Sequence, residues 1–170
     1  MLVEIRCDKF ISNGEQRPPI RFHSGLNTAL GSESGSNSIG KSTFLMIVDF
    51  AFGGDDYVLK STDVQSNVGP HTIQFAFEFG NQMFYFSRNT IDYTHVSPCD
   101  ESYVPITDKT MSRDDFREFL FGKYAISLPH TKFRDIVGRY FRIYGRENLD
   151  EKHPLSNAKT SLQKTLSRRL

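Results

Sequence analysis

Apolar and polar residues alternate in the segment 72–79, and this alternation predicts a β-strand with one apolar face. Four side chains are expected on that face: Ile73, Phe75, Phe77 and Phe79. Gly80-Asn81 predicts a turn that reverses the chain, and 83–88 is expected to be a second strand, so the two strands should form an antiparallel hairpin. The segment 2–7 also alternates, and a short strand at 20–22 is expected to form a second hairpin with it. The two faces of this first strand are expected to hold Leu2, Glu4 and Arg6 on one side and Val3, Ile5 and Cys7 on the other.

Apolar residues at helical spacing predict helical structure in four further segments. These segments are 42–52, 113–122, 131–144 and 154–170. Gly53-Gly54 is typical of the end of the first helix, and Ser112 with Asp115 forms a capping box that opens the second. Thr131 is expected to cap the third helix, which carries one apolar stripe. Elsewhere, 26–30 is expected to be a short extended run, and 55–70 and 92–110 to be loops.

The composition predicts one globular domain with an aromatic core. The 170 residues are 38% apolar and 24% charged, and they include 15 Phe and 7 Tyr but no Trp. A net charge of +1 excludes a bulk electrostatic attraction to nucleic acid. Two distant cysteines exclude a disulfide framework, so we expect a cytoplasmic protein. No run of 18 apolar residues and no basic-then-apolar N-terminus occur, so no contact with a membrane is expected.

The segment 35–42, GSNSIGKS, matches the phosphate-binding loop pattern G-x-x-x-x-G-K-[ST]. Glycines in such a loop let several backbone N–H groups point into one concavity, and the following helix adds its positive N-terminus. We expect Lys41 to reach the β- and γ-phosphates of ATP and the Ser42 hydroxyl to ligate Mg²⁺. The expected nucleotide-binding residues are Gly35, Asn37, Ser38, Ile39, Gly40, Lys41, Ser42 and Thr43.

Two observations bear on whether this motif is a nucleotide site and whether the chain also supplies a catalytic acid. A stretch rich in Ser and Gly raises the odds of a chance match, but the motif follows an extended run and opens a helix, as a phosphate-binding loop requires. The apolar run 44–48 ends in Asp49 and resembles a Mg²⁺-positioning strand. It begins inside the predicted helix, so Asp49 is assigned to the surface or to helix packing. No similar run follows downstream, so no catalytic residue is assigned to this chain.

Together these patterns resemble the N-terminal half of an ATP-binding cassette head of the SMC, RecF and RecN kind. The resemblance lies in the segments 2–5, 10–12, 22–27 and 37–43 and in the hairpin that ends at Arg88. The segments 37–54 and 133–155 are more closely similar to bacterial SMC-like proteins of poorly known function, some of them encoded near phage-defence genes. The resemblance implies an α/β fold of the P-loop NTPase class, with a mixed sheet, an antiparallel hairpin layer and helices.

The resemblance also implies that part of the head is missing from this sequence. In such proteins a long coiled coil leads to a C-terminal half, which carries the Mg²⁺-positioning Asp, the catalytic Glu and the signature motif. We therefore expect residues 1–150 to form the N-terminal lobe and 151–170 to begin a coiled coil or helical arm. The implied partners are that C-terminal half on the same or a separate chain, a second head, DNA, and an effector or accessory protein.

The sequence departs from the family pattern at three places. Ser38 stands where Gly is usual, and Ile11 stands where Arg is frequent. The glutamine that senses the metal in the family has no secure counterpart here. Asp55 and Asp56 match no motif and are expected in a surface turn.

A basic face on the helix 131–144, extended to Arg146, is a candidate for contact with DNA or a partner. At 100° per residue, Arg139, Arg142 and Arg146 project within about 60° of one another. Such a face can bind DNA phosphates, dock the missing half, or simply be solvated.

The leading hypothesis is an ATP-binding lobe of an SMC-like ATPase that dimerises on ATP and acts on DNA. Hydrolysis would need the absent half, so the isolated chain is expected to hydrolyse little. Two alternatives remain open. One is a complete small P-loop phosphotransferase similar to a nucleotide kinase, which would need a parallel sheet. The other is a non-catalytic interaction module whose loop is vestigial.

Overall fold

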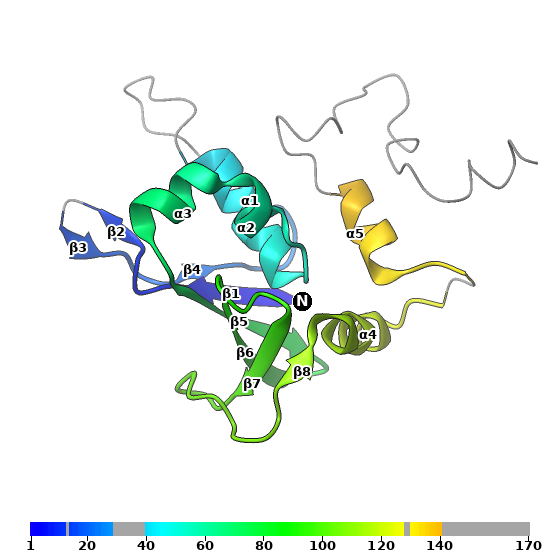
Figure 1. The fold of residues 1–170 in the computed structure, drawn as a ribbon. Helices are drawn as coiled ribbons and strands as arrows, with labels where there is room; N and C mark the ends of the chain where they lie inside the picture. The colour runs from blue at the N-terminus through cyan, green and yellow to red at the C-terminus, as the bar shows by residue number, and fades with distance from the viewer. Residues whose placement is uncertain (13, 29–39, 128–129, 141–170) are drawn as a thin grey trace, which may run out of the picture. The chain divides into compact units, whose positions relative to one another are not determined.

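The computed structural model describes residues 1–12, 14–28, 40–127 and 130–140 (Figure 1). The chain divides into two compact units, Met1–Ile126 and Ser127–Leu170. The domain boundary expected near residue 150, and the coiled-coil start at 151–170, stay predictions because these positions lie outside the described residues.

An antiparallel sheet forms the centre of the first unit (Figure 1). Its six strands are β4 (Ile20–Arg21), β1 (Leu2–Arg6), β5 (Thr72–Phe79), β6 (Gln82–Asn89), β7 (His95–Cys99) and β8 (Met111–Ser112), in that spatial order. A separate small hairpin joins β2 (Ile11–Ser12) to β3 (Glu15–Gln16). Every strand pair among the described residues is antiparallel. The broad prediction of a fold with both helices and an antiparallel sheet layer is therefore confirmed, whereas the expected mixture of parallel and antiparallel strands is not found among the described residues.

The hairpin of β5 and β6 forms where the alternation predicts it. Phe75 lies opposite Phe86, and Phe77 lies opposite Phe84. The turn between the strands places Asn81 at a φ of 62°. Because facing residues of an antiparallel pair share a side of the sheet, these phenylalanines form one continuous aromatic face.

The first strand departs from the predicted alternation at its beginning. Leu2 pairs with Phe77 while Glu4 pairs with Ala76, so one extra residue is inserted between them as a β-bulge. The bulge turns Leu2 to the face that holds Ile5, and both are buried. The prediction that Leu2 shares a face with Glu4 is therefore wrong, because the alternation assumes an unbroken pairing register.

Among the described residues, four helices belong to the first unit and one to the second. They are α1 (Lys41–Ala51), α2 (Asp56–Lys60), α3 (Thr62–Val68), α4 (Arg113–Lys123) and, in the second unit, α5 (Phe133–Tyr140). The predicted first helix is confirmed within one residue at each end. The Ser112 cap of α4 is confirmed too, since its hydroxyl oxygen accepts the N–H of Asp115 at 3.1 Å. The third predicted helix is described as α5, and before its first turn the Lys132 N–H donates to the Asp135 carboxylate at 3.2 Å; the expected Thr131 cap stays a prediction.

The predicted loops contain elements that the pattern does not reveal. The segment 55–70 holds α2 and α3, and 92–110 holds β7. Tyr57 is the buried residue of α2, and its ring packs against Phe50 of α1 at 5.7 Å. These short elements have too few apolar residues to show a period, so packing against neighbouring elements decides their structure.

The core of the first unit lies between the aromatic face of the sheet and the helices that cover it (Figure 1). Phe52, just after α1, meets Phe77 edge to face at 5.3 Å. Phe116 of α4 has no exposed surface, and the centre of its ring lies 5.9 Å from that of Phe75 and 5.1 Å from that of Phe86. The predicted aromatic core is therefore confirmed, and it attaches α1 firmly to the sheet.

Candidate functional site

The candidate phosphate site is the beginning of α1. Gly40 has a φ of 107°, a conformation that residues with a side chain rarely adopt, and the helix starts at the next residue, Lys41. The Gly40 carbonyl accepts the Phe44 N–H at 2.7 Å, which closes the first helical turn. Of the predicted nucleotide-binding residues, the structure describes Gly40, Lys41, Ser42 and Thr43. The others, Gly35, Asn37, Ser38 and Ile39, lie outside the described residues.

The first turn of α1 has the chemistry that an anion requires. The first four N–H groups of an α-helix lack intrahelical acceptors, and their dipoles give this end a partial positive charge. No acidic residue occurs in the first turn, and the N-cap residue, Gly40, has no side chain that could accept hydrogen bonds from its amides. Lys41, Ser42 and Thr43 are half-buried and thus still reach solvent. This turn therefore fits a phosphate group.

The same turn fits a bound Mg²⁺ only in combination with a phosphate. Ser42 offers one hydroxyl oxygen, which is the ligand type that Mg²⁺ prefers. Among the described residues, no three His, Cys, Asp or Glu side chains gather as a metal site. A nucleotide's phosphate oxygens and water would have to supply the remaining ligands.

Two aromatic rings hold the first turn of α1 against the edge of the sheet. Phe44 stacks on Phe22, which follows β4, with the ring centroids 6.2 Å apart and the planes 11° apart. The Phe22 N–H in turn donates to the Val3 carbonyl at 2.9 Å. Residues 26–28, the described part of the expected extended run at 26–30, belong to no strand among the described residues. Residues 29–30 lie outside the described residues.

The other end of α1 is held by Arg88, which lies near the end of β6. Arg88 is 1% exposed, and its guanidinium Nη1 donates to the carbonyls of Phe50 at 2.9 Å and Gly54 at 2.7 Å. Its Nε donates to the Tyr93 carbonyl at 2.8 Å, and Nη2 donates to the same carbonyl and to Asp55 Oδ1 at 2.7 Å. All five N–H donors of the guanidinium are therefore used.

The buried guanidinium of Arg88 has a lowered pKa, and Asp55 is its counter-ion. Desolvation lowers the pKa of Arg88 to about 10, and the hydrogen bond and charge of Asp55 oppose that shift. The guanidinium also lies 3.9 Å from the centre of the Phe50 ring, a cation–π contact. A positive charge beside the last carbonyls of a helix is favourable because that end of the helix dipole is negative.

Asp55 joins Arg88 to the first turn of α4. Its second carboxylate oxygen accepts from Arg113 at 2.5 Å, and Arg117 Nε donates to the Gly53 carbonyl at 3.0 Å. The prediction that Asp55 and Asp56 form a surface turn is wrong, because Asp55 is an ion-pair partner and Asp56 begins α2. We call Arg88, Asp55, Arg113 and Arg117 the arginine cluster.

Asp49 shows how tightly this end of α1 is packed. It has no exposed surface, so of the two expected places, the surface or the helix packing, the structure shows the second. A Cβ atom placed on Gly54 would lie 1.8 Å from Asp49 Oδ2. The glycine predicted at the end of this helix is therefore required by close approach.

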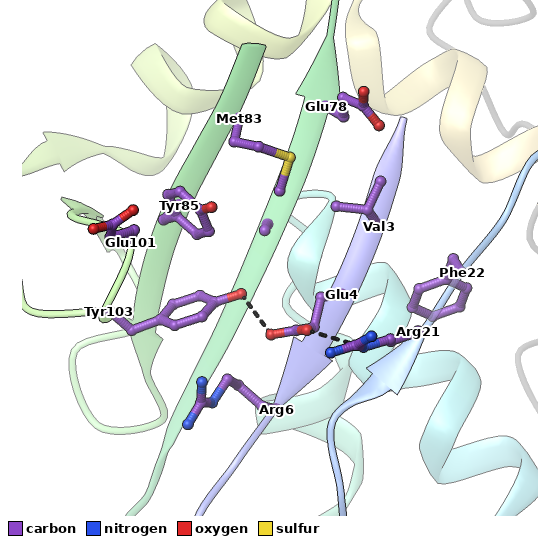
Figure 2. Close-up of a pocket in the computed structure, with 11 residues that line it drawn as sticks. Val3, Glu4, Arg6, Arg21, Phe22, Glu78, Met83, Tyr85, Glu101 and Tyr103 are labelled. Carbon is purple, nitrogen blue, oxygen red and sulfur yellow. Dashed lines mark hydrogen bonds and ion pairs between the residues drawn. The ribbon is translucent and has the colours of Figure 1, made fainter. Parts of the chain in front are cut away.

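A second feature, a hollow of about 480 Å³, lies on the opposite face of the sheet (Figure 2). Tyr103 donates its hydroxyl to Glu4 at 3.1 Å, and Glu4 pairs with Arg21 at 3.6 Å. Burial and the neighbouring Glu4 raise the pKa of Tyr103. Tyr103 has a φ of 62°, uncommon for a residue with a side chain. Sequence analysis missed this hollow because its walls come from distant segments: β1, β5, β6 and the loop around Tyr103.

The hollow is lined by acidic and basic groups that pair with one another. Glu4 is already satisfied by Arg21 and Tyr103, and Arg6 lies 5.0 Å from the centre of the Tyr103 ring. Two further carboxylates, Glu78 and Glu101, are exposed at its edge. Acidic and basic groups thus occur together, and no single charge dominates.

The predicted basic face is mostly beyond what the structure describes. Arg139 lies in α5, but its side chain, together with Arg142 and Arg146, falls outside the described residues. Its role in contacting DNA or a partner stays a prediction.

Comparison with known proteins identifies no relative of this chain. No model of a protein family, no curated protein and no solved structure matches it. Within the described residues, no helix is long and apolar enough to cross a membrane. Function therefore has to be argued from the site itself.

Proposed function

We propose that the chain is the ATP-binding lobe of an SMC-like ATPase head, a cytoplasmic P-loop protein. One observation carries the proposal: within the G-x-x-x-x-G-K-S pattern, α1 begins at Lys41, directly after a glycine with positive φ. That is the local geometry in which a phosphate-binding loop presents the amides of a helix N-terminus.

The antiparallel sheet supports an ATPase lobe over the alternative of a complete phosphotransferase. A small nucleotide kinase would build its core from strand–helix units with parallel strands. Every described pair in this chain is antiparallel, and α1 packs on an aromatic antiparallel hairpin. A parallel core would have to come from another segment, as an ABC-type head with an absent C-terminal half implies.

In the proposed mechanism, ATP lies between two heads and its binding closes the dimer. The first-turn amides and Lys41 would hold the β- and γ-phosphates, and Ser42 would be a ligand of a Mg²⁺ whose charge would help to neutralise the phosphates. The acid that activates water belongs to the absent half. The opening and closing of the heads would act on DNA, with phage defence as a candidate setting.

Calorimetric titration of ATP–Mg²⁺ into the 170-residue chain tests the proposal. Lys41→Ala should weaken binding by about 10- to 100-fold, because a hydrogen bond to a charged group contributes about 1.5–3 kcal/mol. Lys60→Ala is the matched control, since Lys60 is an exposed lysine that pairs with Asp56 on α2. It should bind as wild type does. Equal heats from wild type and Lys41→Ala would refute the nucleotide site and favour an interaction module.

A further inference from the structure

We propose that Arg88 is a positioning residue for nucleotide binding: by holding the last turn of α1, it sets where the first turn of that helix points. The inference rests on the proposed function, because it assigns a role toward the same site. Arg88 touches neither Lys41 nor Ser42 in any contact described above. It acts through α1, because it contacts the last turn of this helix while Lys41 and Ser42 lie in the first turn.

The guanidinium of Arg88 forms hydrogen bonds with three parts of the first unit: the end of α1, the carbonyl after β6, and Asp55. Nη1 bonds two carbonyls at the end of α1, those of Phe50 and Gly54. Nε and Nη2 bond the Tyr93 carbonyl after β6, and Nη2 also bonds Asp55. Since a guanidinium is rigid and planar, the direction of the last turn of α1 is set relative to the sheet.

Because α1 is long, a small tilt about its C-terminal end moves its N-terminal turn by a larger distance. Eleven residues at about 1.5 Å each span about 16 Å. A tilt of about 5° about the clamped end would move the first turn by about 1.4 Å. A displacement of about 1 Å would lengthen the hydrogen bonds from the first-turn amides to a bound phosphate beyond the roughly 2.7–3.2 Å range in which such bonds form.

The burial pattern shows why the first half of α1 depends on this clamp. Residues 47–51 are buried, whereas 41–46 are only half-buried. Apart from the stacking of Phe44 on Phe22, the packing that restrains the helix is concentrated at its end. Among the described residues, the Phe22–Phe44 stack is then the main side-chain contact of the first turn of α1, so loosening the other end shifts Lys41 more easily.

Arg88→Lys tests the role, with Arg113→Lys as the matched control. Arg113 shares the acceptor Asp55, but the bonds described for it reach no carbonyl of α1. Lysine keeps the charge but has three donors on a flexible stem, so it cannot reproduce the planar clamp. The ATP–Mg²⁺ dissociation constant of the 170-residue chain is measured at a temperature where circular dichroism shows each variant to be folded.

We expect Arg88→Lys to weaken ATP binding by about 10-fold or more, and Arg113→Lys to change it by less than about 2-fold. In the folded protein, hydrogen exchange at the amides of residues 44–46 should also accelerate in Arg88→Lys relative to those of α4, because the Phe44 N–H is the donor of the bond that closes the first turn. A purely structural role would lower the melting temperature and leave both readouts unchanged. That result would overturn the inference.

The two proposals fail in different ways. If wild type binds ATP and Arg88→Lys binds it equally well, the positioning role is wrong and the nucleotide site stands. If wild type and Lys41→Ala give equal heats, the nucleotide site is wrong and the role of Arg88 in binding falls with it. Should Arg88→Lys not fold, Asp55→Asn serves instead, because it removes the charged acceptor that, together with the Tyr93 carbonyl, fixes the plane of the guanidinium and so the direction of its bonds to α1. Wild-type affinity in Asp55→Asn would then overturn the inference.

Discussion

Gly54→Ala is expected to destabilise the first unit severely. The added Cβ would lie 1.8 Å from Oδ2 and 2.9 Å from the backbone oxygen of Asp49, whose side chain has no exposed surface. Real Cβ contacts do not fall below 3.0 Å, so atoms must move by 3.0 − 1.8 = 1.2 Å. Overpacking of this kind costs about 1–3 kcal/mol. The movement also disturbs two bonds of Gly54, one to the Asp49 carbonyl at 2.8 Å and one from Arg88 at 2.7 Å.

At about 1 kcal/mol for each disturbed bond, the total loss is about 3–5 kcal/mol. Typical domains have about 5–15 kcal/mol of stability, so the variant should unfold at a much lower urea concentration. Urea titration followed by far-ultraviolet circular dichroism measures the change. Gly122→Ala is the control: it lies within α4 with no atom near its added Cβ, and it should gain about 0.5–1 kcal/mol. A loss below about 1 kcal/mol in Gly54→Ala would refute the packing argument.

Two further predictions concern the core and the pH dependence of stability. Phe116→Ala should lower the free energy of unfolding by about 3–5 kcal/mol in the same titration. The reason is that removal of a fully buried ring, which contacts Phe75 and Phe86, leaves a cavity. A decrease of less than about 1 kcal/mol would contradict this prediction. Burial raises the pKa of Cys7 from 9.0 to about 11, so the folded state holds this proton more tightly than the unfolded chain does. The resulting stabilisation is complete below pH 9 and is lost as the pH rises toward 11. The urea midpoint should therefore fall less steeply over this range in Cys7→Ala than in wild type, and equal slopes would disprove the linkage.

Sequence alone predicts the elements whose signals are local. The β5–β6 hairpin follows from a period of two and a glycine turn, and the start of α4 follows from the Ser112 capping box. The beginning of α1 at Lys41 follows from a motif of eight consecutive residues, 35–42. Each of these predictions needs information only from residues close together in the chain, and each is confirmed where the structure describes it.

Tertiary structure decides the features that depend on residues distant in the chain. The bulge that buries Leu2 arises from the register between β1 and β5, which are about seventy residues apart. The pairing of Arg88 with Asp55 and with the end of α1 crosses more than thirty residues. Since Asp55 follows a glycine pair in a polar stretch, its local sequence is typical of a surface turn, and only the approach of a buried guanidinium makes it an ion-pair partner. Local chemistry thus determined where the candidate phosphate turn begins, whereas long-range packing decided what holds that turn in place.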